Sequence, residues 1–142
     1  MTEVAFHFNV PDRLAYACRV IRKAQSQGKR LVVLADEAGA QQLDRLLWTF
    51  SARDFIAHCR LPADAAVVAA SPVVIGGEPA QWPHSDVLLN LSGQVPAGFE
   101  RFERLIELVT GDEGDRHHAR ARWRHYAQRG YPIVQHDLSA RG

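Results

Sequence analysis

Residues 30–35 read Arg-Leu-Val-Val-Leu-Ala, and Asp36 follows them directly. A short, almost continuous apolar run is typical of a strand that is covered on both faces, as in a parallel sheet. Asp36 is a favourable N-cap, and Leu43, Leu46 and Leu47 then recur at the spacing of a helix with one buried face. A buried strand that leads into an amphipathic helix predicts an α/β fold, with a mainly parallel sheet flanked by helices.

The same alternation of strands and helices continues on both sides of this unit. Upstream, apolar residues alternate through 4–8, which predicts a strand. A helix is then expected between Asp12, as its N-cap, and Gly28, just beyond its C-cap. Downstream, the apolar runs 73–75 and 87–91 predict two further strands. This order is that of right-handed crossovers in a parallel sheet.

Three segments between these elements and the last helix are less regular. Residues 55–56 indicate a brief extended piece, and 62–71 form a loop in this interpretation. Residues 102–109 fit both a helix and a strand, and we expect a short helical approach into a core strand.

The C-terminal part predicts one long helix and a final strand. Asp112 or Asp115 opens the helix, and Gly130 ends it. Residues 131–134 are expected as an edge or tail strand, because Pro132 has no N–H to donate to a ladder.

Length and composition fit one globular domain, which we expect to span 1–142. Hydrophobic residues make up 46% of the chain and charged residues 23%, so disorder is not expected. A net charge of +1 argues against a protein that coats nucleic acid with its whole surface, so any basic site must be local. No run approaches the ~18 apolar residues of a membrane span, and the first residues lack the pattern of a secretory signal. We therefore expect a cytoplasmic protein.

The motifs of nucleotide-binding and catalytic sites are missing from the sequence. No G-x-x-x-x-G-K-[ST] loop occurs, and the first predicted strand leads into 9–12 (Asn-Val-Pro-Asp) without a glycine-rich turn. His58 and Cys59 are adjacent, so on an extended chain they point to opposite faces and cannot act together. His117 and His118 diverge around a helix and need a third ligand to bind a metal. We expect no cofactor, no metal site and no catalytic residue.

Arginines give the last predicted helix an unusual face. Arg116, Arg120 and Arg124 are spaced four residues apart, so they line up along one side over two turns. Arg122 and Arg129 add charge nearby. No Glu or Asp lies four residues after any of the three aligned arginines, which leaves an anion to be identified.

Two aromatic residues share this segment with the arginines. Trp123 can border the arginine face, while Tyr126 can point inward. Arginine beside exposed aromatic surface is typical of interface hot spots. The alternative is a solvated face in which Trp123 and Tyr126 serve only the core.

Three anions could occupy such a face. An acidic peptide with an apolar anchor fits best, because guanidinium groups bind carboxylates in a bidentate way while Trp123 packs against the anchor. A nucleic-acid backbone fits less well with the modest net charge, and a small phosphorylated metabolite would need glycine-rich walls.

The order of several motifs resembles one family. The run 119–126 (Ala-Arg-Ala-Arg-Trp-Arg-His-Tyr), followed by Gly130 and Tyr131, resembles the closing helix of the chi subunit of bacterial DNA polymerase III holoenzyme. Four other stretches are similar to the same family in the same order. They are the strand with Phe6 and Phe8, the turn 28–30, the motif Leu43-Asp44-x-x-Leu47-Trp48 with Phe55 and His58 after it, and the strand 87–91.

The resemblance implies a single Rossmann-like α/β domain without nucleotide chemistry. It implies a non-catalytic accessory subunit of the clamp loader in DNA replication. Such a subunit would bind the psi subunit on one surface. On another it would bind the acidic C-terminal tail of single-stranded-DNA-binding protein, and so reach DNA indirectly.

The family's binding residues carry over position by position. The resemblance places Arg116, Arg120 and Arg124 at basic positions that hold the acidic tail, with Trp123 beside the tail's hydrophobic end. One basic position near the end of the helix is Ala127 here, which weakens part of that contact unless Arg129 replaces it.

The psi-binding surface is expected around Trp48, Phe50 and Phe55, although these residues could equally be core. The loop 62–71 departs from the family in length and composition. Two other functions stay open at this point: a small phosphate- or nucleotide-binding α/β enzyme, and a module that binds nucleic acid directly.

Overall fold

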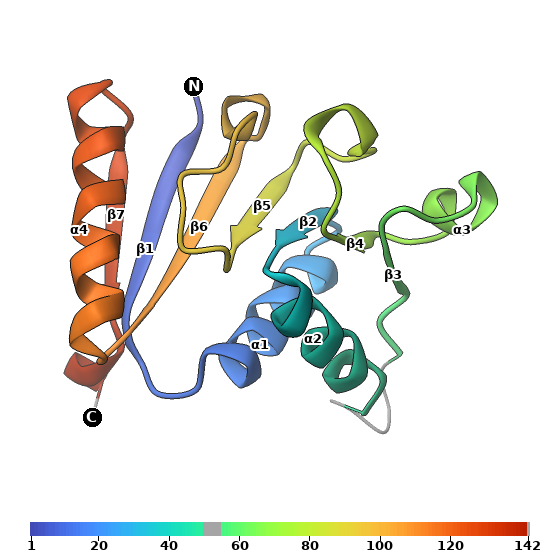
Figure 1. The fold of residues 1–142 in the computed structure, drawn as a ribbon, viewed down its shortest axis with the longest axis horizontal. Coiled ribbons are helices and arrows are strands. Elements are labelled where there is room, and N and C mark those ends of the chain that lie inside the picture. The colour runs from blue at the N-terminus through green and yellow to red at the C-terminus, as the bar shows by residue number, and fades with distance from the viewer. Residues whose placement is uncertain (50–54, 142) are drawn as a thin grey trace.

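A computed structural model describes residues 1–49 and 55–141, and over this part of the chain it contains one seven-stranded sheet (Figure 1). The strand order is β3-β4-β2-β5-β6-β1-β7, and all six neighbouring pairs are parallel. The strands are β1 (Glu3–Val10), β2 (Leu31–Leu34), β3 (His58–Arg60), β4 (Val73–Ile75), β5 (Val87–Asn90), β6 (Arg104–Thr110) and β7 (Ile133–Asp137). The predicted α/β class with a parallel sheet is confirmed.

The described residues also form four α-helices and three 3-10 turns, of which η3 follows the last strand. The helices are α1 (Arg13–Ser26), α2 (Glu37–Thr49), α3 (Ala65–Ala69) and α4 (Glu113–Gln128). The 3-10 turns are η1 (Pro79–Gln81), η2 (Phe99–Arg101) and η3 (Leu138–Arg141). Figure 1 shows α4 beside β7 and β1 at one end of the sheet, while α1 and α2 lie toward its middle.

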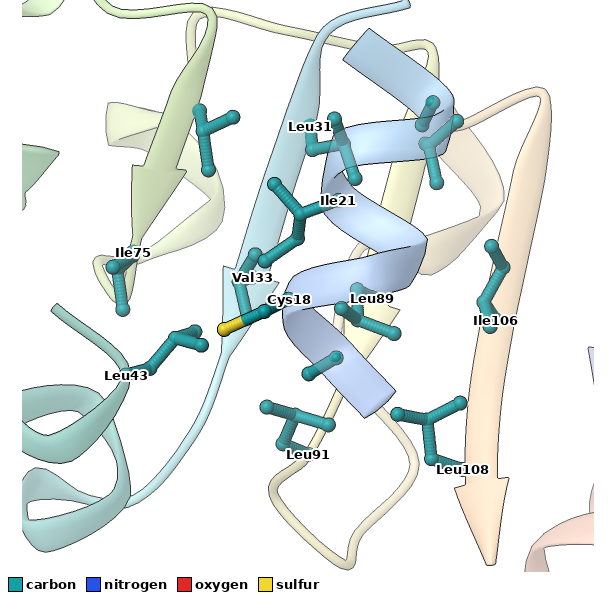
Figure 2. Close-up of a cluster of buried hydrophobic side chains, with 14 of the residues drawn as sticks. Cys18, Ile21, Leu31, Val33, Leu43, Ile75, Leu89, Leu91, Ile106 and Leu108 are labelled. Carbon is teal, nitrogen blue, oxygen red and sulfur yellow. The ribbon is translucent and has the colours of Figure 1, made fainter. Parts of the chain in front are cut away.

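Alternating side chains divide the core into two layers. In β2, Leu31 and Val33 join one buried cluster with α1 and α2, while Val32 joins a second cluster that includes Ala119 and Tyr126 of α4. Figure 2 shows the first cluster, in which Cys18 and Ile21 of α1 pack on the face formed by β2, β5 and β6. Both faces of the central strands are therefore covered, which explains their continuous apolar runs.

Polar caps define the helix ends that the sequence predicts. The Asp12 carboxylate accepts a hydrogen bond from the backbone N–H of Ala15 at 3.1 Å, so it caps α1 as expected. Asp112, rather than Asp115, caps α4. Gly130 has a φ of +79°, a left-handed conformation that favours glycine just beyond a helix end.

Three expectations for the irregular segments need correction. The core strand expected within 102–109 is β6, which begins at Arg104. The helical segment expected to precede it lies earlier, as the 3-10 turn 99–101. The extended piece expected at 55–56 lies slightly later, where β3 pairs with β4. The loop 62–71 contains α3, a helix of five residues that buries none of its side chains. The bounds of β6 and β3 depend on pairing with strands that are distant in the sequence, and a short stretch of residues does not reveal such pairing.

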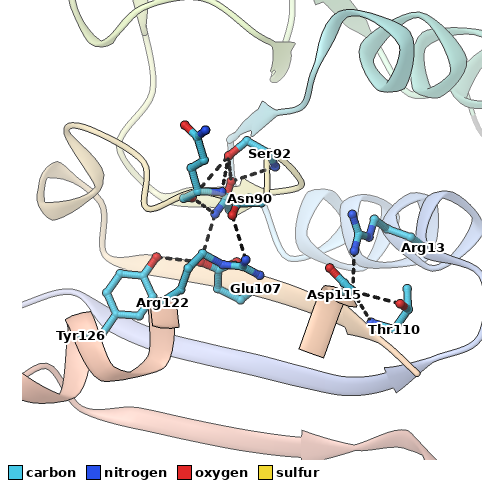
Figure 3. A network of polar contacts seen from close by, with 10 residues as sticks. Arg13, Asn90, Ser92, Glu107, Thr110, Asp115, Arg122 and Tyr126 are labelled. Carbon is cyan, nitrogen blue, oxygen red and sulfur yellow. Dashed lines mark hydrogen bonds and ion pairs between the residues drawn. The ribbon is translucent and has the colours of Figure 1, made fainter. Parts of the chain in front are cut away.

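The N-terminal end of α4 is fixed to the rest of the molecule by Asp115 (Figure 3). Its carboxylate accepts hydrogen bonds from the backbone N–H and the hydroxyl of Thr110, at 2.8 and 3.0 Å, and pairs with Arg13 of α1 at 2.5 Å. Partial burial raises the pKa of Asp115, but these bonds outweigh burial and hold the pKa below its ordinary value. The carboxylate thus joins β6, α4 and α1 as a charged group.

Among the helices of the described residues, none is long and apolar enough to cross a membrane.

Candidate functional site

A buried ionic network determines how α4 lies on the sheet (Figure 3). The Glu107 side chain on β6 is fully buried, and Arg122 Nε donates a hydrogen bond to its carboxylate at 3.1 Å. The Tyr126 hydroxyl donates to the same carboxylate at 2.6 Å, and the Asn90 amide donates at 3.0 Å. Arg122 also donates to the carbonyl oxygen of Gly93 at 3.0 Å. Arg122 is only 4% exposed, so it does not add to the basic surface as the sequence interpretation held.

The burial of Arg122 sets the outward direction of its neighbours on α4. Arg120 and Arg124 are each two residues away from Arg122, or about 200° around a helix, so they point away from the sheet. Arg120 and Arg124 are both exposed. Tyr126 is fully buried, which confirms the prediction that it points inward.

A groove of about 430 Å³ lies between α4 and the end of the sheet formed by β1 and β7. Its lining consists of Phe8, Ala119, Arg120, Trp123, Arg124 and Gln135. Trp123 is half-buried and packs against Phe6 and Phe8, with ring centroids 5.0 and 6.1 Å apart. The groove therefore has an aromatic floor and two guanidinium groups at its rim.

The rim arginines have few partners of their own. Arg120 lies 3.4 Å from Glu113, which stands seven residues earlier on the same face, and both side chains are more than half exposed. This pair spans seven residues, so it lies outside the four-residue spacing considered from the sequence, and it gives Arg120 an acidic neighbour. Arg124 donates to the carbonyl oxygen of Arg120 at 3.4 Å and forms no ion pair with any residue of 1–49 or 55–141. A long ion pair in water is weak, so an incoming carboxylate can replace Glu113.

Arg116 stands apart from the groove that contains the other three residues predicted with it. It is exposed, and its charge acts on Asp137 at the end of β7. Hydrogen bonds from Asn9 and Ser139 lower the pKa of Asp137, and the Arg116 guanidinium adds to this effect. Farther along α4, Ala127 is exposed and Arg129 donates to the carbonyl oxygen of His125 at 3.1 Å. The structure therefore brings Arg120, Trp123 and Arg124 together and leaves Arg116 at the margin.

Two groove residues, Phe8 and Gln135, were not predicted from the sequence as part of the site. Phe8 is two residues after Phe6 on the first strand, so the sequence predicts that both side chains lie on the same face of the sheet. The contact between Phe8 and Trp123 could not be predicted, because it joins distant segments. Gln135 lies on β7, in a segment that the sequence indicates only as an edge strand.

The chemistry of the groove is that of recognition. Guanidinium groups bind carboxylates or phosphates, and an aromatic floor accepts an apolar side chain. Over 1–49 and 55–141, no three His, Cys, Asp or Glu side chains gather in a way that could hold a metal ion.

An aromatic patch lies elsewhere, at the end of α2. Trp48 is 58% exposed and Phe55 is 62% exposed, and their ring centroids are 5.2 Å apart. Core packing, the alternative considered for these residues, therefore does not explain either side chain. Phe50, which was expected to join them, lies outside the described residues. Exposed neighbouring aromatic rings are typical of protein interaction surfaces.

A buried histidine supports this patch from below. The ring of His58 lies 5.0 Å from that of Trp48, edge-on, and its Nδ1 lies 2.6 Å from the carbonyl oxygen of Ile56. Asp44 approaches Nε2 at 2.9 Å, an ion-pair distance without the alignment of a hydrogen bond. Cys59 points to the other face of β3, into the cluster with Val74, so the separation of His58 and Cys59 predicted from the sequence is confirmed.

Comparison with known proteins gives one consistent result. The family model described as DNA polymerase III chi subunit, HolC, matches residues 1–134. The DNA polymerase III subunit chi of Pseudomonas aeruginosa is 38% identical over 145 residues, which cover 97% of this chain and 98% of that protein. The DNA polymerase III subunit chi of Haemophilus influenzae is 23% identical over 123 residues, covering 86% of this chain and 85% of that protein.

Proposed function

Because this chain belongs to the family of DNA polymerase III chi subunits, we propose that it is a non-catalytic accessory subunit of the replicase, which binds the acidic C-terminal tail of single-stranded-DNA-binding protein. It does so in the groove between α4 and the β1–β7 end of the sheet. A second surface binds the psi subunit and so connects the chain to the clamp loader. The protein reaches DNA through these partners and works in the cytoplasm.

One observation carries the tail-binding proposal: the groove combines an aromatic floor with two outward guanidinium groups. Arg120 and Arg124 can hold two carboxylates one helical turn apart, while Trp123 contacts an apolar end group. Buried Arg122 strengthens the argument, because its anchoring to Glu107 keeps the two rim arginines facing the solvent. A ligand with several carboxylates and an apolar C-terminal residue matches this arrangement in both charge and shape.

Replacing Arg120 with alanine should weaken binding of a short acidic peptide with a C-terminal phenylalanine carboxylate by about tenfold. The reason is that a hydrogen bond to a charged group contributes about 1.5–3 kcal/mol, and exposure here reduces that contribution. Isothermal titration calorimetry measures the dissociation constant. Added salt should weaken wild-type binding as well, since it screens charges at the rim.

Arg45→Ala is the matched control, because Arg45 is an exposed arginine on α2 that lies outside the groove. It should leave the affinity within about twofold of the wild type. Equal losses for Arg120→Ala and Arg45→Ala, or no peptide binding by the wild type at low salt, would contradict the proposal.

For the psi-binding surface we propose the patch of Trp48 and Phe55, supported by their exposure and mutual contact. The buried ring of His58 lies next to both rings of the patch and 2.9 Å from Asp44. Aromatic side chains have only two rotatable bonds, so they lose little conformational entropy on binding, which suits a stable subunit interface.

Trp48→Ala should reduce binding of the psi subunit from the same organism by at least about tenfold, because exposed aromatic residues are enriched among hot spots. The free energy of unfolding should change by less than about 1 kcal/mol, since more than half of the side chain is exposed. Surface plasmon resonance and a urea titration measure the two quantities. Val67→Ala, which removes another exposed apolar side chain on α3, should affect neither; an equal loss with that variant refutes this assignment.

A further inference from the structure

A second and larger cleft opens on the opposite face of the sheet. It has a volume of about 590 Å³, which lies within the range of small-ligand sites, and it runs between α1 and the strands β6, β1 and β7. α1 packs over β2 and β6. Beyond the edge of this helix, the side chains of His7 on β1 and His136 on β7 form the floor of the cleft. Val134 lies on the same side of β7 as His136 and is 39% exposed, so this part of the sheet is open to solvent.

The wall that α1 contributes carries uncompensated positive charge. Arg19 and Lys23 are four residues apart, so both project from one side of the helix into the cleft. Both are exposed, and neither forms an ion pair with any residue in the described part of the chain. Two neighbouring cations without a partner favour an anionic ligand.

The acidic groups of the cleft lie near the amino ends of the strands, and each has a partner of its own. Glu3 pairs with Arg104 at 2.8 Å, and Glu103 lies 3.7 Å from Lys29. Asp86 accepts a hydrogen bond from the backbone N–H of Arg30 at 2.9 Å. The amino ends of the strands therefore carry charges of both signs, and among the described cations of this cleft Arg19 and Lys23 are the two without an ion pair.

Aromatic rings meet at the end of the cleft near the carboxyl ends of the strands. The rings of His7 and His136 have centroids 4.6 Å apart, and the Tyr16 hydroxyl lies 2.6 Å from Nδ1 of His7. Tyr16 is three residues before Arg19 on α1, so the aromatic group and the cations share one side of that helix. Aromatic rings next to two cations form the combination that binds nucleotides in single strands, with the base stacked on a ring and the phosphate held by charge.

We propose that this cleft binds a nucleotide unit, with its phosphate between Arg19 and Lys23 and its base against the rings of His7, Tyr16 and His136. The unit belongs either to single-stranded DNA or to a free mononucleotide, because the two share the same recognised chemistry. This site is separate from the peptide groove, so it does not rest on the function proposed above.

The test uses the full chain with two probes, a fluorescein-labelled oligothymidine of about 15 nucleotides and thymidine monophosphate. Fluorescence anisotropy measures oligonucleotide binding at low salt, and two-dimensional NMR follows the backbone amides during titration with the mononucleotide. Arg19→Glu should weaken oligonucleotide binding by about tenfold, because it removes one phosphate contact and adds a repelling charge. Arg45→Glu changes the net charge equally on another helix and should leave binding within about twofold.

Each outcome has a defined meaning. Shifts of the amides of Tyr16, Arg19, Lys23 and His136 with either probe support the site, and binding of the mononucleotide alone identifies free nucleotide as the source. Equal weakening by Arg19→Glu and Arg45→Glu overturns the proposal, since nonspecific attraction then explains the binding. The absence of binding by both probes also overturns it. Peptide affinity of Arg19→Glu, measured in parallel, reports on the groove of α4 independently.

Discussion

Replacing Arg122 with alanine should lower the free energy of unfolding by about 3–5 kcal/mol, the largest loss of stability that we expect from any single arginine of α4. The substitution leaves the fully buried Glu107 carboxylate without its cation, while Tyr126 and Asn90 still donate to it. Two neutral donors do not compensate for the burial of a full charge. Urea unfolding followed by circular dichroism measures the change from the midpoint and slope of the transition.

The pH dependence of this loss follows from the pKa of Glu107. Burial raises this pKa above its ordinary value of 4.5, and Arg122, Tyr126 and Asn90 act in the opposite direction. Without Arg122 the pKa must rise further. For an acid whose pKa is raised in the folded state, stability is fully present below the unfolded pKa and is lost as pH rises through the folded pKa. The deficit of Arg122→Ala should therefore be larger at about pH 8 than at about pH 5.

Arg124→Ala provides the control on the same helix. Its side chain is exposed and outside the network, so its removal should change the free energy of unfolding by less than about 0.5 kcal/mol. Similar stability of Arg122→Ala and Arg124→Ala at neutral pH would show that the buried pair does not hold α4 in place.

Trp123→Ala should reduce binding of the acidic peptide at least about thirtyfold, which corresponds to the ~2 kcal/mol or more of a hot-spot residue. The indole forms the floor of the groove together with Phe8, and the tail's apolar end has no comparable contact in the variant. Calorimetry with two peptides, ending in phenylalanine or alanine, gives a sharper measurement. The wild type should distinguish the two peptides, and Trp123→Ala should bind both equally weakly.

Trp123 also packs on Phe6, so the variant should lose about 2 kcal/mol of stability, less than a fully buried tryptophan would. Trp123→Phe keeps a ring at this position and separates the two effects, because it should restore most of the stability and part of the affinity. Arg116→Ala should weaken binding less than threefold or so, since its side chain lies outside the groove. If a folded Trp123→Ala protein still discriminates between the peptides, the apolar end binds elsewhere.

Much of the fold follows from the sequence because its parallel strands are short apolar runs bounded by good caps. Residues 31–34 and 87–90 form the strands that their composition predicts, and Asp12 caps the helix that it was expected to open. α3 was not predicted because Ala65–Ala69 is too short to display a helical period and buries no side chain. Strand order depends on contacts between distant segments, so local patterns do not contain it.

The candidate site was predicted in its residues but not in its geometry. Arg120, Trp123 and Arg124 line one groove, whereas Arg116, one turn earlier on α4, lies near Asp137 at the end of β7. Arg122 was misjudged because its partner, Glu107, is fifteen residues earlier on another element. A signal was present: Glu107 is the only charged residue in the run 105–109, and a buried carboxylate at such a position requires a cation.

Side chains along β1 and β7 alternate between the two faces of the sheet, so these two strands contribute residues to both binding surfaces. Phe8 and Gln135 face the groove beside α4, and their neighbours His7 and His136 face the cleft beside α1. Ligands on the two sides would be separated by the thickness of a single β-sheet layer, and β7, as an edge strand, is held by one neighbour only. A shift of this strand toward one ligand moves it away from the other. Occupancy of either surface would then change the affinity of the other by the same factor, as thermodynamic linkage requires.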